Sequence, residues 1–132
     1  MRAILRHFAR AWDRDELLVG RASWAEYWSF QFVSACLSVA ISIILVLLDG
    51  AFGLSPLAGY AVSIVWLMVI VPPLVGVGVR RLHDIGLSGW WHLVALIPFV
   101  GPPLTLLVML LPGRRGANRY GESPRAAPAD GG

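Results

Sequence analysis

The absence of charge over three long stretches constrains this chain most. Residues 27–48 and 50–79 carry no formal charge, and within 85–113 the only titratable side chain is His92. Each stretch exceeds the roughly 20 apolar residues that cross a ~30 Å hydrocarbon core as a helix. With 57% hydrophobic residues in 132, the chain is also too small to bury its apolar surface as a soluble domain. The pattern predicts an all-α integral membrane protein.

The N-terminal 22 residues form a separate amphipathic segment. Apolar side chains recur at near-helical spacing on one face, and arginines recur every fourth residue on another. These are Ile4, Leu5, Phe8 and Trp12, and Arg2, Arg6, Arg10 and Arg14. We expect residues 1–22 to form a cytoplasmic helix that lies either on an anionic membrane surface or on the protein's own cytoplasmic side.

Residues 23–124 are predicted to form the helical membrane domain. Ser23 and Glu26 match a capping box, so the first membrane helix should begin near Trp24. Ser55 can cap a second helix with Pro56 at its first position, which gives spans near 28–48 and 56–79. Small residues repeat at four-residue spacing on both spans, which predicts helix packing and permits self-association. They are Ser34, Ser38, Ser42, Gly59 and Ser63.

The third hydrophobic segment, 90–112, is broken by Pro and Gly at 98 and 101–103, so it is either spanning or re-entrant. All eleven basic residues are Arg: five precede the first span, two stand at 80–81, and four follow residue 113. With the N-terminus inside, a re-entrant segment keeps every Arg on the cytoplasmic side, as the positive-inside rule favours. The C-terminal residues 125–132 are predicted to be disordered.

The polar turn RRLHDIGLSGWW, residues 80–91, is open to four interpretations: a topology-fixing turn, an anionic-headgroup site, a partner contact, or a catalytic site. If the second helix continues, Arg80 and Asp84 can pair one turn apart. We expect Asp84 to act locally, by accepting amide hydrogens of the turn or holding an Arg. Ser88 is predicted to cap the next helix, which Trp90 and Trp91 anchor at the interface.

Catalysis and metal binding have little support in the sequence. His7, His83 and His92 lack metal-ligand spacing, and Cys36 lies within the first span. His83 and Asp84 would project about 100° apart on a helix, so they do not form a relay by themselves. We therefore expect no metal, no cofactor and no enzymatic activity.

Three motifs give the chain a family resemblance: GRASWAEYW at 20–28, RRLHDIGLSGWW at 80–91, and PGRRGANRYGESP at 112–124. In order and spacing, the chain resembles the bacterial inner-membrane family of domain of unknown function 805. The resemblance implies several membrane helices and supplies no activity. With the tail inside, the motifs share one side of the bilayer, so Glu26 or Asp84 could pair with Arg119, and Asn118 could close the GANRYG turn.

The function expected from these features is a multi-pass inner-membrane accessory or assembly module with both termini cytoplasmic. It would bind anionic lipid headgroups or a membrane protein partner, and no nucleic acid. The alternatives are an oligomeric small transporter or channel subunit, and a membrane-bound enzyme using the turn from Arg80 to Asp84. The candidate cluster comprises Arg21, Glu26, Arg80, Arg81, His83, Asp84, Ser88, Trp90, Trp91, Asn118, Arg119 and Tyr120.

Overall fold

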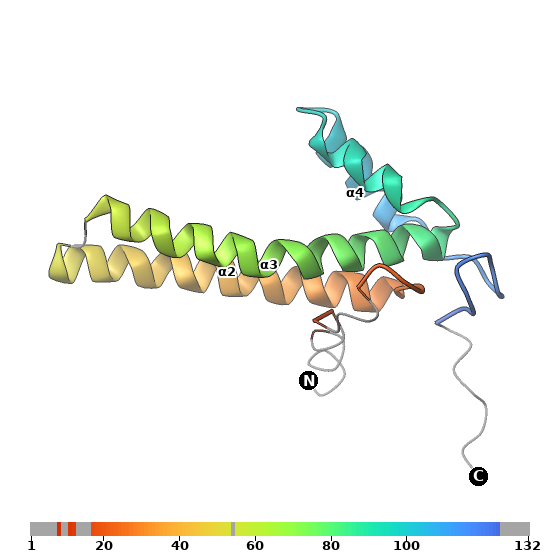
Figure 1. Cartoon of the computed structure of the whole chain (residues 1–132), viewed down its shortest axis with the longest axis horizontal. Coiled ribbons are helices and arrows are strands. Elements are labelled where there is room, and N and C mark those ends of the chain that lie inside the picture. The colour runs from red at the N-terminus through yellow and green to blue at the C-terminus, as the bar shows by residue number, and fades with distance from the viewer. Residues whose placement is uncertain (1–7, 9–10, 13–16, 54, 125–132) are drawn as a thin grey trace, which may run out of the picture.

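Two long antiparallel helices dominate the computed structural model, which describes residues 8, 11–12, 17–53 and 55–124. Helix α2 (Trp24–Phe52) and helix α3 (Pro56–Ile85) lie side by side (Figure 1). Both are long and apolar enough to cross a membrane. Most of the predicted amphipathic helix, including its four arginines, lies outside the described residues, as do residues 125–132.

Local chemistry sets the boundaries of both long helices. The Ser23 hydroxyl accepts the Glu26 amide at 3.1 Å, which confirms the predicted start at Trp24. Gly53 ends α2 in the left-handed conformation, with φ at 60° and its N–H donating to the Asp49 carbonyl. The Ser55 hydroxyl then caps α3, as predicted, and α3 continues through its two internal prolines to Ile85.

The buried residues of the hairpin gather at one end, where α2 begins and α3 ends; we call this the polar end. Phe30 of α2 is fully buried there and stacks on Phe8, with ring centroids 5.2 Å apart. Phe8 therefore packs on the protein's own surface, one of the two predicted placements. Val77 and Leu82 of α3 belong to the same core. Away from the polar end, the apolar side chains of both helices are mostly exposed, as a lipid-facing hairpin requires.

One of the predicted packing residues joins the two long helices. The Trp66 indole N–H of α3 donates to the Ser38 hydroxyl of α2 at 3.0 Å, and Ser38 donates to the Ser34 carbonyl at 2.8 Å. Farther along the hairpin, Ser42, Gly59 and Ser63 line an open groove. The small-residue face near Ser38 thus serves packing within the chain.

The third hydrophobic segment is a short helical hairpin. The 3-10 helix η1 (Gly89–Leu96) runs out from the polar end, and helix α4 (Gly101–Leu110) returns to it (Figure 1). With 8 and 10 residues, the arms are about 16 and 15 Å long, half of a ~30 Å hydrocarbon core. The segment therefore folds back on itself, as the predicted re-entrant arrangement requires. Its tip carries Phe99, which is 96% exposed.

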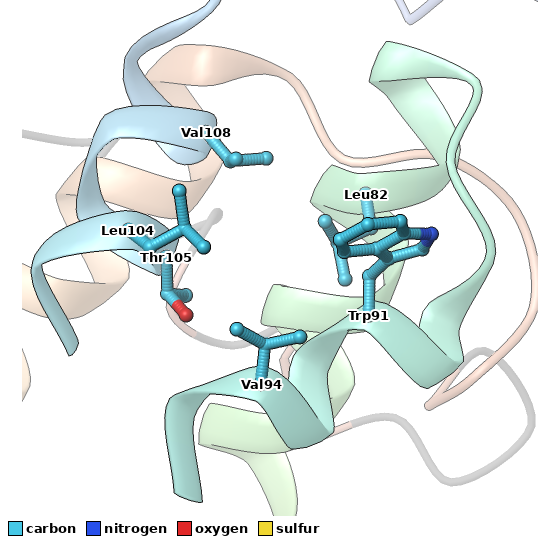
Figure 2. Close-up of a pocket in the computed structure, with 6 residues that line it drawn as sticks. All are labelled: Leu82, Trp91, Val94, Leu104, Thr105 and Val108. Carbon is cyan, nitrogen blue, oxygen red and sulfur yellow. The ribbon is translucent and has the colours of Figure 1, made fainter. Parts of the chain in front are cut away.

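Apolar contacts and close backbone approach hold this hairpin together. A Cβ on Gly101 would lie 2.0 Å from the Val94 carbonyl oxygen, so only glycine permits the arms to approach so closely. Figure 2 shows side chains of η1, α4 and the end of α3 facing a crevice of about 10 Å³, hardly larger than one water. They are Leu82, Trp91, Val94, Leu104, Thr105 and Val108.

Ser88 occupies the N-cap position of η1, as predicted, but does not cap it with its side chain. Its hydroxyl makes no capping hydrogen bond with the described residues, and the following helix is 3-10. The start of η1 is positioned by packing instead: a Cβ on Gly89 would lie 2.7 Å from Cγ1 of Val79.

Candidate functional site

Asp84 is the centre of a buried ion cluster at the polar end. It lies in the last turn of α3 and is only 2% exposed. Its Oδ1 accepts Nε of Arg21 at 3.0 Å, and Nη2 of Arg21 is 2.9 Å from the same oxygen. Its Oδ2 accepts Nη1 of Arg81 at 2.6 Å. Asp84 therefore binds a residue 63 positions away, besides the local Arg contact that the sequence predicted.

Arg21 also holds the segment that follows α4. Its Nη1 donates to the carbonyl of Gly116 at 2.6 Å, and its Nη2 donates to the carbonyl of Arg114 at 2.6 Å. The Arg114 amide in turn donates to the Asp84 carbonyl at 2.9 Å. A guanidinium suits this role because its planar fork presents several donors at once. One side chain thus ties together the loop before α2, the end of α3 and the segment after α4. From here on, we call this segment, residues 111–124, the tail.

Arg80 and Arg81 point to different partners. Nη2 of Arg80 lies 3.1 Å from Oε1 of Glu26, which corrects the predicted pairing of Arg80 with Asp84. Adjacent helical residues project about 100° apart, so Arg80 faces α2 while Arg81 faces the tail. Nη2 of Arg81 donates to the Leu111 carbonyl. Only the amide half of the predicted capping box is used for capping, because the Glu26 carboxylate pairs with Arg80.

His83 and the tail loop make a second layer beside the ions. Nδ1 of His83 lies 3.1 Å from the Gly20 carbonyl, which can only accept, so we assign the ring proton to Nδ1. The imidazole stacks on Tyr120, with centroids 3.8 Å apart and planes within 6°. Nδ2 of Asn118 donates to the His83 carbonyl at 2.8 Å.

Asn118 closes the GANRYG turn, as predicted. Its Oδ1 accepts the Tyr120 amide at 2.8 Å, and its backbone exchanges two 3.0 Å hydrogen bonds with Gly121. The predicted pairing of Arg119 with Glu26 or Asp84 is wrong. The turn directs Arg119 outward, where its guanidinium lies 4.7 Å from the Tyr120 ring centroid.

Two glycines of the cluster were not recognised in the sequence as contact positions. A Cβ on Gly113 would lie 1.8 Å from Oδ2 of Asp84, so the tail can pass the carboxylate only without a side chain. Gly86 ends α3 with φ at 90°, and the Arg114 side chain lies against it. The only signal for Gly113 was its place in the third motif, because its contact partner is far away in sequence.

The cluster separates buried arginines from exposed ones. Arg21, Arg80 and Arg81 are buried and engaged with carboxylates inside the protein. The exposed arginines are Arg114, whose side chain also lies against Gly86, Arg115 and Arg119. Trp90 and Trp91 are exposed at the same end. Among the described residues, no group of three or more His, Cys, Asp or Glu could hold a metal ion. The inner arginines thus build the fold, and the outer ones are accessible to a ligand.

Comparisons with known proteins cover this whole architecture. Residues 18–122 match the family model described as "Protein of unknown function (DUF805)". The chain is 33% identical over 106 residues to inner membrane protein YhaI of Escherichia coli strain K12, which spans 80% of this chain and 84% of that protein. It is 34% identical over 110 residues to inner membrane protein YhaH of the same strain, 83% and 88% of the two chains. No solved structure matches the chain.

The matched region includes both long helices, the hairpin of η1 and α4, and every residue of the ion cluster around Asp84. Both relatives are inner membrane proteins, in agreement with the two apolar helices. The chain is therefore a helical membrane protein and belongs to the DUF805 family.

Proposed function

We propose that this protein is a non-enzymatic accessory or assembly module of the inner membrane that binds anionic lipid headgroups at its cytoplasmic face. The observation that carries the proposal is the outward presentation of Arg114, Arg115 and Arg119 by a tail that the buried Asp84 cluster holds in place. A structural core of ions thus supports an outer rim of basic residues.

The charge distribution supports a cytoplasmic position of the polar end. All six described arginines lie there: Arg21, Arg80, Arg81, Arg114, Arg115 and Arg119. The opposite end of the α2–α3 hairpin carries an exposed acid, Asp49, instead. By the positive-inside rule, α2 and α3 cross the membrane as a pair, and η1 and α4 enter it from the cytoplasmic side.

The exposed rim has the composition of a surface for anionic lipid. Each Arg near an anionic leaflet contributes about 1 kcal/mol, so three give about 3 kcal/mol, a preference of roughly 100-fold. Trp90 and Trp91, both exposed, suit the depth at which headgroups meet acyl chains. The three buried arginines contribute less to this preference, because two internal carboxylates offset two of their charges and burial keeps the guanidiniums away from the headgroups.

Lipid titration monitored by native mass spectrometry tests the proposal. The full chain in a neutral detergent should bind phosphatidylglycerol more tightly than phosphatidylcholine. Replacing Arg114, Arg115 and Arg119 together with Gln should remove most of this preference. The matched control is Glu122→Gln, which neutralises an exposed acid of the same loop and should preserve or strengthen binding of phosphatidylglycerol. If the triple variant keeps the wild-type preference, the proposal is refuted.

A further inference from the structure

We propose that the groove between α3 and η1 binds one acyl chain of an anionic phospholipid whose headgroup lies at Arg119. This inference rests on the proposed function and deepens it, because it assigns a specific site to the lipid. It requires three properties of the groove: enough apolar volume, an opening at the basic rim, and a polar lining that is concentrated at that opening.

The groove has the size and lining of a ligand site. Its volume is about 590 Å³, within the roughly 300–1,000 Å³ of small-molecule pockets. Val75 and Val79 of α3 form one wall, and Leu93 and Leu96 of η1 form the other. From Val75 to His83 it follows α3 for eight residues, or about 12 Å. These walls suit hydrocarbon and offer nothing to a free inorganic anion.

Close packing fixes the shape of the groove. A Cβ on Gly78 would lie 2.4 Å from the His92 ring, so the missing side chain lets that ring rest directly on α3. Gly89 allows a similar approach at the start of η1, beside Val79. The two walls are therefore held at a defined separation by side chains that pack directly on glycine backbone, and the groove exists before a ligand enters.

The polar lining is concentrated at the end nearest the ion cluster, apart from His92, whose ring lies against Gly78 midway along the groove. His83, Ser88 and Tyr120 line the groove there. The Ser88 hydroxyl is not used for helix capping among the described residues, and it can donate to a phosphate oxygen. Because the proton on Nδ1 of His83 faces Gly20, the opposite ring nitrogen is an acceptor and donates no hydrogen bond to a phosphate.

Arg119 gives this opening its charge. The guanidinium of this exposed residue lies 4.7 Å from the ring centroid of Tyr120, which is itself part of the groove wall. A phosphate placed there meets a cation, while its acyl chain extends between the apolar walls. An anionic amphiphile thus complements the groove at both ends, which favours a membrane phospholipid over an apolar peptide as the occupant.

Photocrosslinking of the full chain in lipid vesicles tests the site. The vesicles contain phosphatidylethanolamine and phosphatidylglycerol, and a trace of phosphatidylglycerol carries a diazirine in its acyl chain. After illumination, peptide mass spectrometry should find labels concentrated at 75–79 and 93–96, above the lipid-facing surface around Val65. Labelling spread evenly over all exposed apolar positions of α3 overturns the inference.

A matched pair of variants sharpens the test. Val75→Phe places a ring in the groove and displaces at least two methylenes of the chain, so labelling there should fall roughly tenfold. Val65→Phe makes the same change on an exposed position of α3 outside the groove and should leave labelling unchanged. If Val75→Phe fails to fold, as judged by circular dichroism, Ala95→Phe fills the groove from η1.

The outcomes also separate this inference from the proposed function. Wild-type labelling in a folded groove-filling variant overturns the acyl-chain site, whatever the arginine variants show. An unchanged phosphatidylglycerol preference in the triple Gln variant refutes the headgroup function instead. If a phosphatidylcholine probe labels the groove as strongly as phosphatidylglycerol, the assignment of an anionic lipid is overturned.

Discussion

Asp84→Asn should destabilise the protein, because it removes the carboxylate at the centre of the ion cluster. The change keeps the size of the side chain and removes the charge that Arg21 and Arg81 share at 2.9 and 2.6 Å. Their side chains are 1% and 0% exposed, so water cannot replace the carboxylate. Removing one partner of a buried ion pair destabilises by about 3–5 kcal/mol. Carbonyl contacts of both guanidiniums remain, so we expect about 3 kcal/mol.

That loss is a large fraction of the roughly 5–15 kcal/mol that stabilises a typical protein. Reversible unfolding in mixed micelles, followed by circular dichroism, measures it. Asp49→Asn is the matched control, because Asp49 is exposed at the opposite end of the hairpin, and its change should stay within about 0.5 kcal/mol. If Asp84→Asn is no more destabilising than Asp49→Asn, the carboxylate does not hold the cluster together.

Two further predictions follow from the same contacts. Gly113→Ala forces a methyl group to 1.8 Å from Oδ2 of Asp84 and should destabilise the protein by about 1–3 kcal/mol in the same unfolding assay. Its control is Gly50→Ala, which has no atom within 4 Å and should be neutral or slightly stabilising. Equal effects of the two substitutions would contradict the packing at Gly113. A double-mutant cycle between Arg21→Gln and Asp84→Asn should show a coupling free energy of about 1–3 kcal/mol. The destabilising effects of Arg119→Gln and Asp84→Asn should instead be additive. Coupling confined to Arg119 would contradict the observed pairing.

The helix boundaries could be predicted because they depend on neighbours in sequence. Ser23 accepts an amide three residues ahead, and Ser55 does the same next to Pro56. The turn closed by Asn118 is equally local. Long uncharged stretches likewise fix helix type and environment, because lipid offers the backbone no partners.

The partners within the cluster could not be predicted, because they depend on packing between distant segments. The sequence predicts that the three polar motifs lie on one side of the bilayer. It also indicates that Arg80 can pair with Asp84, because the two residues are one helical turn apart. The antiparallel packing of α2 on α3 instead directs Arg80 to Glu26 and leaves Asp84 to Arg21 and Arg81. The position of Gly113 against Asp84 has the same origin.

The course of the third segment shows the same limit. Its prolines and glycines predict a break without saying whether the chain crosses or returns. The return depends on contacts such as that of Gly101 with the Val94 carbonyl, and on the tail carbonyls that accept from Arg21. Composition therefore predicts the membrane class, whereas three-dimensional packing makes the third segment fold back on itself.

Cysteine accessibility in spheroplasts tests the central claim that the ion cluster and the tail share the cytoplasmic side. In a Cys36→Ser background, single cysteines are placed at two exposed positions, Ala117 in the tail loop and Asp49 at the opposite end of the hairpin. A membrane-impermeant maleimide should label Asp49→Cys in intact spheroplasts, and Ala117→Cys only after the inner membrane is opened. Labelling of Ala117→Cys in intact spheroplasts would contradict the account.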